Sequence, residues 1–505
     1  MKNTVDRLAW VRAAAAIAGV TVACWAGASA MAQPTAPGAI VPDGDHADWA
    51  GVGTTGIHAD ARYLYARART GAVRSLGTSD QPLRFEFDLD GDPKTGAAVG
   101  GLGVDLLVEF APRVEGERRG RGPRIEGYVG GQTRRLEWQE IGLYSGPTHA
   151  SDSFELRLDR ALLGGAGLPG SAAGQLRGRV TLLSNDGAAV ASGGEIQSVP
   201  APAAVSPSPS QATVPPKPQG AVRLVSYNVL WGSPHREPAS FSRVLRALEP
   251  DIVLAQEWQL QARGQEARGP QIGEPELEAW FGEHAPASAD QTWTAETNDG
   301  LGVALITRLP LSRRGPQRVI TGDTTRWDFP VRLASGVIDS PIGPIVIGSV
   351  HLKASGSLGS EEDTRRLAEA DKVNGVMREL AAGLRNPLII VGGDFNMNGT
   401  TGVIDRVRRG LDGDGSDLEI ARPLVLGEAL AYTFVGQPDE GRPTAVRLDY
   451  FTYPGAQLRV AQAFVLDTSR LDAQALRSAG LQAGDSWGSD HLPVVIDLLP
   501  AQAPN

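Results

Sequence analysis

A proline-rich segment in the middle of the chain most limits what this sequence can fold into. Residues 201–220 read APAAVSPSPSQATVPPKPQG and carry a single charged side chain, that of Lys217. A stretch of proline, alanine and serine cannot bury a core, so we expect an extended, semi-rigid linker. The chain has 505 residues, enough for two domains, and the linker predicts where they divide. Residues 39–200 and 221–500 are therefore interpreted separately.

Residues 39–200 have the pattern of many short strands. Leu83–Asp90 and Ser153–Leu158 alternate apolar and polar side chains, and helical periodicity is scarce. We expect an all-β sandwich domain. Its DG…DW start, its DLDGDPKTG turn and its late ELRL strand resemble family 9 carbohydrate-binding modules. The resemblance implies an accessory module that binds a carbohydrate or another surface ligand, or that acts as a spacer.

Three carboxylates of this module stand at alternate positions across a strand end. Asp88, Asp90 and Asp92 could hold Ca²⁺, because calcium prefers crowded oxygen ligands. A solvated acidic turn explains the same spacing. The basic segment 113–124, RVEGERRGRGPR, also has two interpretations, a solvated loop or a contact for a polyanion.

The N-terminus has the features of an export signal. Basic residues precede an apolar run over residues 13–27, which is too short to span a membrane as a helix. Ala30–Ala32 is a small-x-small site, so we expect residues 1–32 to be a cleaved signal peptide. The mature protein would be secreted or periplasmic and would have no transmembrane segment. Cleavage would also remove Cys24, the single cysteine, so we expect no disulfide.

Residues 221–500 mix strands and helices, which predicts an α/β sandwich. Strands end repeatedly at a polar residue, as in LIIVGGDFN, where a buried strand meets two glycines and then Asp394. Functional side chains often follow buried strands, so these residues are candidates for one shared cleft. Eight residues have this position: Asn228, Glu257, His351, Asp394, Asn396, Asp449, Asp490 and His491.

The motifs SYNVLWG, AQEW, SVHLKA, GGDFNMN, RLDYF and GSDHLPV occur in this order. Together they resemble the endonuclease/exonuclease/phosphatase superfamily, whose members include deoxyribonuclease I, neutral sphingomyelinases and inositol polyphosphate phosphatases. The resemblance covers residues 221–500. It implies a four-layered α/β sandwich and hydrolysis of phosphate esters with Mg²⁺, or Mn²⁺, as cofactor.

The resemblance also implies roles for the eight residues, and phosphate ester chemistry agrees with them. Glu257 is the expected metal ligand, assisted by Asn228 and Asp490. Asp394 would orient or deprotonate the attacking water, and Asn396 would bind the water or the phosphate. His351 and His491 would contact the phosphate or the leaving oxygen. Asp449 would hold the imidazole of His491 in place.

The expected activity is hydrolysis of phosphodiester bonds, with nucleic acid as the first substrate class. The formal net charge of −10 gives no overall basic surface for nucleic acid, but a bound metal can supply positive charge locally. A sphingomyelinase-like phospholipase C and an inositol polyphosphate phosphatase are the alternatives within the family. A non-catalytic surface-binding protein is the alternative outside it, and the complete motif set argues against it.

Overall fold

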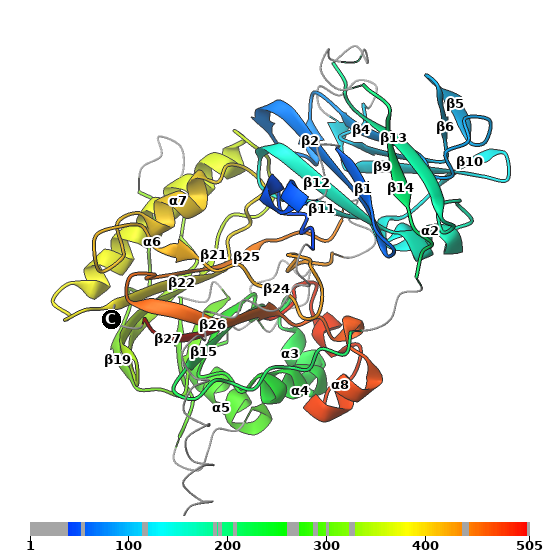
Figure 1. Cartoon of the computed structure of the whole chain (residues 1–505). Coiled ribbons are helices and arrows are strands. Elements are labelled where there is room, and N and C mark those ends of the chain that lie inside the picture. The colour runs from blue at the N-terminus through cyan, green and yellow to red at the C-terminus, as the bar shows by residue number, and fades with distance from the viewer. Residues whose placement is uncertain are drawn as a thin grey trace, which may run out of the picture.

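A computed structural model describes residues 39–501 of the protein, apart from residues 52–55, 114–119, 185–188, 190–193, 206–209, 260–271, 286–290, 299–301, 323–328 and 437–443. The predicted signal peptide lies outside the described residues. Figure 1 shows a β-rich N-terminal part beside a larger C-terminal part. None of the helices in the described ranges is long and apolar enough to cross a membrane.

The N-terminal part is an all-β sandwich, as predicted. One sheet has the order β1 (Ile57–Ala59), β2 (Tyr63–Arg74), β12 (Ser151–Asp159), β11 (Tyr144–Gly146). The other has the order β10 (Gln132–Arg135), β9 (Pro123–Val129), β7 (Leu106–Phe110), β4 (Leu83–Asp88), β13 (Gly174–Leu182), β14 (Gln197–Ala201). Alternating residues such as Phe85, Phe87 and Leu156 bury one face of each sheet in a common core.

Short elements connect the strands of this sandwich. Two small sheets pair β3 (Thr78–Ser79) with β8 (Gly120–Arg121) and β5 (Ala97–Val99) with β6 (Leu102–Val104). The helical segments are η1 (His46–Gly51), η2 (Trp138–Ile141) and α2 (Arg160–Gly165).

The C-terminal part contains two sheets that pack face to face. The first has the order β17 (Thr294–Thr297), β18 (Val303–Thr307), β16 (Ile252–Gln256), β15 (Val222–Asn228), β27 (Val494–Pro500), β26 (Leu458–Val465), β24 (Leu424–Val425). The second has the order β19 (Leu311–Arg314), β20 (Leu333–Ser340), β21 (Gly343–His351), β22 (Leu388–Asp394), β25 (Asp449–Tyr453), β23 (Glu419–Ile420). Leu254, Ile347 and Ile390 lie in the apolar core between them.

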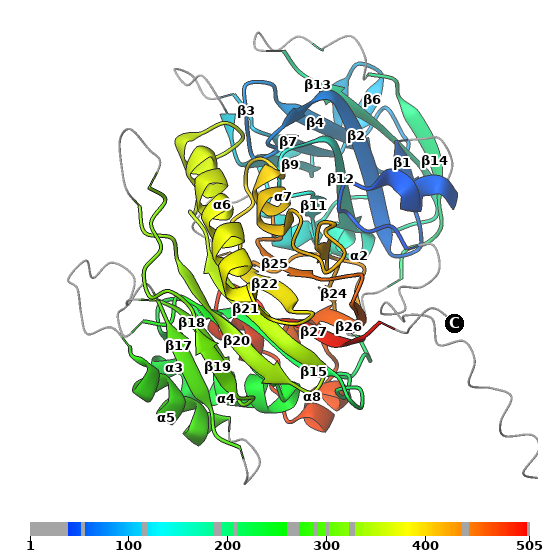
Figure 2. The same cartoon turned by 90° about the vertical axis from the view of Figure 1, so that its left-hand side faces the viewer.

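Helices cover the outer face of each sheet, which confirms the predicted four-layered α/β sandwich. On the first sheet lie α4 (Pro238–Leu248) and α5 (Glu274–His284), and on the second lie α6 (Glu361–Ala381) and α7 (Gly402–Arg408), as Figure 2 shows. Helix α6 begins at residue 361, because Ser360 caps it by accepting a hydrogen bond from the Asp363 amide. The remaining helical segments are α3 (Ser233–Arg236), η4 (Thr468–Arg470), α8 (Ala473–Ala479) and η5 (Asp485–Gly488).

The predicted linker is described over residues 201–205 and 210–220. Residues 204 and 205 hydrogen-bond to the sandwich, whereas residues 210–220 lie against the C-terminal part. The Ser210 amide donates to the Arg470 carbonyl over 2.8 Å, and the Pro215 carbonyl accepts from Arg223 over 3.0 Å. Lys217 pairs with Asp251 at 2.7 Å. Proline leaves the segment extended, and these contacts hold it on the surface of the domain that follows.

Candidate active site

The ends of several strands meet at one edge of the two C-terminal sheets. Strands β15 and β16 are parallel, and so are β21 and β22, so each pair brings its carboxyl ends to the same edge. In the second sheet Asp394 stands between two neighbours in register, His351 on β21 and Asp449 on β25. Gly393 allows this close approach: its φ is 137°, and a Cβ there would lie 2.1 Å from the Val350 carbonyl oxygen.

Asp394 is the centre of the polar network at this edge. Its Oδ2 accepts hydrogen bonds from Nδ2 of Asn396 over 3.0 Å and from Nδ2 of Asn228 over 3.3 Å. Both histidines also face Oδ2, with Nε2 of His351 at 3.5 Å and Nε2 of His491 at 3.8 Å. Burial raises the pKa of Asp394 above its ordinary value.

His491 is held by a second buried carboxylate. Its Nδ1 lies 2.8 Å from Oδ2 of Asp449, which also accepts a hydrogen bond from the Thr433 hydroxyl over 2.7 Å. Burial alone would lower the pKa of His491, but the carboxylates of Asp449 and Asp394 outweigh it and raise the pKa to about 10. His491 is therefore an imidazolium at neutral pH, with its Nε2–H directed at Asp394.

Glu257 occupies the end of the neighbouring strand β16. It has a φ of 59°, a backbone conformation unusual for a residue with a side chain, and its Oε1 accepts from Asn228 Nδ2 over 3.3 Å. Its Oε2 is buried without a hydrogen-bond partner, and burial raises the pKa of Glu257. An orphaned, buried carboxylate oxygen fits a bound cation, because a cation would supply the missing partner and favour the ionised form.

Asp490 lies in the segment that carries His491. The Ser489 hydroxyl donates to the Asn228 carbonyl over 2.7 Å and holds this segment against the end of β15. Asp490 is buried, and its backbone carbonyl accepts from the Val435 amide over 2.8 Å. All eight residues that the sequence predicted at strand ends are thus buried or nearly so at one edge of the two sheets.

Comparison with known proteins identifies the type of domain that carries this cluster. A family model described as Endonuclease/Exonuclease/phosphatase family matches residues 225–491, which is more than half of the chain. The protein belongs to this family. The match includes every one of the eight predicted residues.

Several solved structures are similar to this chain. An endonuclease/exonuclease/phosphatase from Bacteroides vulgatus is 15% identical, with a TM-score of 0.36, over 56% of this chain and 99% of that one. The human Nocturnin catalytic domain is 18% identical, with a TM-score of 0.32, over 57% of this chain and 97% of that one. Sphingomyelinase C from Streptomyces griseocarneus is 15% identical, with a TM-score of 0.33, over 55% of this chain and 99% of that one. The comparison with curated proteins finds no similar sequence.

Arg332 is a member of the cluster that the sequence did not indicate. Its Nη1 lies 3.1 Å from Nδ1 of His351. A guanidinium can only donate, so Nδ1 accepts and the proton of the neutral imidazole is on Nε2, facing Asp394. Burial and the charge of Arg332 hold the pKa of His351 well below its ordinary value. Arg332 stands alone between Val331 and Leu333, a pattern that carries no functional signal.

The carboxylates predicted to hold calcium are grouped differently from the prediction. Within the described ranges, Asp88 and Asp90 meet Asp105, with ligand atoms within 4.8 Å of one another. Asp92 is not part of this sandwich acidic cluster, because the chain turns at Gly91 and the carboxylate of Asp92 caps the Lys94 amide at 3.0 Å. Asp105 lies between β6 and β7, and β7 pairs with β4, so spacing along the sequence does not reveal that proximity.

Proposed function

We propose that the protein is a secreted or periplasmic, divalent-metal-dependent phosphodiesterase that acts on nucleic acid. The observation that carries the proposal is that two histidines in different protonation states both face the carboxylate of Asp394. His491 is charged and His351 is neutral, and each directs an Nε2–H toward the same carboxylate oxygen. Two donors that converge beside a carboxylate suit a reacting phosphate with an attacking water next to it.

In the proposed reaction a water attacks phosphorus and the bond from phosphorus to the leaving oxygen breaks. Asp394 accepts the proton of the water, and Asn396 holds the carboxylate in position. His491 donates to a non-bridging oxygen, where negative charge accumulates in the transition state. His351 donates a hydrogen bond from Nε2 to the leaving oxygen, which departs with the electron pair of the broken bond and takes its proton from solvent. The geometry of both imidazoles is set beforehand, by Asp449 and by Arg332, so little reorganisation is needed during the reaction.

Family members are generally dependent on divalent metals, and Glu257 is the residue best suited to hold one. Asn228 and Asp490 would assist it. Mg²⁺ or Mn²⁺, when bound, would supply positive charge to the phosphoryl oxygens. This local charge would offset the acidic character of the chain as a whole, whose net charge is −10.

A substrate panel tests the proposal. Bis-p-nitrophenyl phosphate, plasmid DNA, RNA, sphingomyelin and inositol phosphates are each incubated with the enzyme in Mg²⁺ or Mn²⁺ and again with EDTA. We expect hydrolysis of bis-p-nitrophenyl phosphate and of nucleic acid, abolished by EDTA and lowered at least ~100-fold in Glu257→Ala and Asp394→Ala. Glu379→Ala, an exposed position on α6, is the matched control.

Two results would contradict the proposal in different ways. Absence of all hydrolysis in the parent, or equal rates in the variants and the control, would overturn the enzyme assignment. Turnover of sphingomyelin or inositol phosphates without turnover of nucleic acid would overturn only the substrate class. Secretion is tested separately, by the N-terminal sequence of the protein recovered from its native host.

A further inference from the structure

The N-terminal sandwich is docked directly beside the catalytic edge of the C-terminal domain. The Ser75 hydroxyl donates to the carbonyl of Asn398, two residues beyond Asn396, and accepts from the Leu358 amide over 3.0 Å. The Ala150 amide donates to the Gly399 carbonyl over 2.8 Å. These contacts join the sandwich to the loops that follow β21 and β22, the two strands that carry His351 and Asp394.

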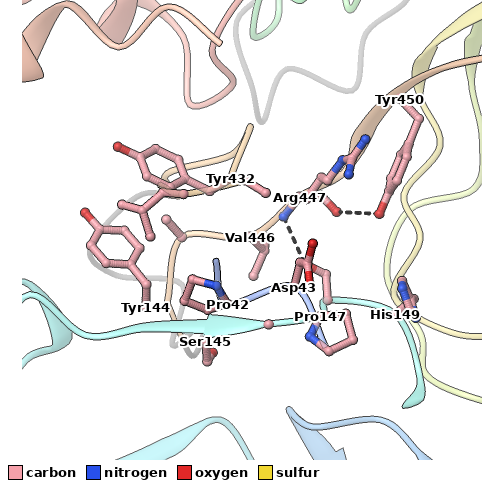
Figure 3. A pocket seen from close by; sticks show the side chains of 15 residues that line it. Pro42, Asp43, Tyr144, Ser145, Pro147, His149, Tyr432, Val446, Arg447 and Tyr450 are labelled. Atoms are coloured by element: carbon pink, nitrogen blue, oxygen red, sulfur yellow. Dashed lines mark hydrogen bonds between the residues drawn. The ribbon is translucent and has the colours of Figure 1, made fainter. Parts of the chain in front are cut away.

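Buried charges and stacked rings hold the two parts in this position. Glu428 of the C-terminal domain lies 2.9 Å from Arg62, 3.5 Å from Arg157 and 3.0 Å from the Tyr63 hydroxyl, all in the sandwich. Tyr144 of the sandwich stacks on Tyr432 with ring centroids 5.2 Å apart. Figure 3 shows this stack on one side of a small cavity at the junction. The sandwich is therefore a fixed part of the catalytic surroundings and not a loosely tethered module.

A cleft of about 480 Å³ with a mixed polar and apolar lining lies between the two parts and includes Asn396 of the candidate active site. Asn396 and Asn398 line the catalytic end. Ser355 and Ser357 line the C-terminal wall, while Thr78 and Arg121 line the sandwich wall. The β3–β8 pairing sets Thr78 directly opposite Arg121, so both side chains come from one small two-stranded sheet.

The lining residues limit what the cleft can accept. Among the described residues that line it, Arg121 is the one with a charged side chain, and hydroxyl and amide groups supply most of the other polar contacts. The described lining residues include no aromatic ring on which a base could stack. Leu76, Pro147, Ala354 and Val446 add apolar surface to the cleft, about as much as the polar groups do. An arginine among hydroxyls and amides suits a sugar–phosphate unit.

We propose that this cleft is a subsite for the sugar–phosphate backbone of a polymeric phosphodiester, with Arg121 contacting a phosphate next to the scissile one. The inference rests on the proposed function and adds to it that the substrate extends across both domains. It also gives the basic segment 113–124 a role through its described member Arg121, whereas residues 114–119 lie outside the described residues. Arg121 is a specificity residue, because it touches the substrate away from the reacting atoms.

The test compares Arg121→Ala and Arg121→Lys with the parent and with Arg135→Ala. Arg135 is an exposed arginine on β10, the edge strand of the larger sandwich sheet, and it serves as the matched control. For each protein, kcat/KM is measured on single-stranded oligonucleotides of increasing length and on bis-p-nitrophenyl phosphate. Binding of a fluorescent oligonucleotide is measured in EDTA as a function of salt, so that one readout does not depend on turnover.

We expect Arg121→Ala to lower the ratio of oligonucleotide kcat/KM to bis-p-nitrophenyl phosphate kcat/KM about tenfold, mainly through KM. The slope of log Kd against log salt should fall by about 0.7, as for one lost phosphate contact on a single strand. Arg121→Lys should retain most of the kcat/KM ratio and most of the salt slope of the parent, since a lysine also binds phosphate.

Each other outcome has a defined meaning. Equal ratios and slopes in Arg121→Ala and Arg135→Ala, with the parent active on oligonucleotides, would overturn the inference and leave the proposed function standing. A parent that hydrolyses bis-p-nitrophenyl phosphate but no oligonucleotide would overturn the inference and the nucleic acid assignment together. A parent with no phosphodiesterase activity would overturn the proposed function itself. A lower thermal midpoint in Arg121→Ala together with equal loss on both substrates would mean a structural role instead.

Discussion

Glu428 holds the two domains together, and replacing it with glutamine tests whether the docked arrangement is needed for function. Its side chain is 5% exposed, and its partner Arg157 is 2% exposed. Burial by itself would raise the pKa of Glu428, but the charges of Arg157 and Arg62 outweigh it, so the pKa lies below its ordinary value of 4.5. The carboxylate is thus ionised and paired in the native protein.

The size of the effect follows from the arginine that remains. Removing one partner of a buried ion pair costs about 3–5 kcal/mol, because the other charge stays buried without compensation. Arg157 keeps its position over the Tyr63 ring, 3.8 Å from the centroid, which offsets part of that cost. We therefore expect Glu428→Gln to weaken docking by about 3 kcal/mol, or roughly 100-fold in the docking equilibrium.

Calorimetry and hydrogen exchange measure the loss of docking. In Glu428→Gln we expect a separate, earlier melting transition and faster exchange in β2, β12 and residues 424–430. The ratio of oligonucleotide to bis-p-nitrophenyl phosphate turnover should fall as in Arg121→Ala, because the cleft loses a wall. Glu379→Gln, at an exposed position on α6, is the matched control. Unchanged melting and exchange would refute the reasoning, since they would mean that the buried pair contributes nothing to docking.

The ion pair of Glu428 with Arg157 also predicts how docking of the two domains depends on pH. A carboxylate whose pKa is lowered on folding contributes stability above its ordinary pKa, here 4.5, and loses it as the pH falls through the lowered value. Docking in the parent should therefore weaken below about pH 4.5, whereas docking in Glu428→Gln should depend much less on pH in that range. A parent that docks equally well at pH 3 and pH 6 would contradict this.

Two further predictions concern the other acidic sites. Asp449→Asn should lower kcat by about 100- to 10,000-fold with little change in KM, because the amide no longer fixes the imidazole of His491 toward Asp394. An unchanged kcat in steady-state assays would show that this orientation is unimportant. The sandwich acidic cluster of Asp88, Asp90 and Asp105 contains a wholly buried carboxylate, that of Asp88, whose Oδ1 has no hydrogen-bond partner. A bound cation would supply that partner, so 10 mM Ca²⁺ should stabilise the sandwich of the parent by about 1.5–3 kcal/mol. Thermal unfolding of Asp105→Asn should show no such gain, and an equal gain in both proteins would exclude this site.

Much of the candidate site could be predicted because its signals are local. A buried run such as Leu388–Val391 ends in two glycines and Asp394, so strand, turn and functional side chain are adjacent in the sequence. Asp449 and His491 were found by the same reasoning. Arg332 was not found, because its importance comes from His351 on the neighbouring strand and not from its own neighbours. Asp105 was missed and Asp92 chosen instead for the same reason, since strand pairing brings Asp105 to Asp88.

The sequence by itself predicted the fold classes, and it singled out the eight polar residues that the structure brings to one edge of the two sheets. Hydrophobic periodicity and strand-end residues depend on the chain within a few positions, so they can be interpreted without a structure. Only the tertiary structure decided how the sandwich sits on the catalytic domain. The contacts of Glu428 with Arg62 and of Tyr144 with Tyr432 join residues hundreds of positions apart, and nothing near either residue indicates its partner. The cleft that Arg121 lines lies where those contacts bring the two parts together, so only the structure could suggest a role for Arg121 in substrate binding.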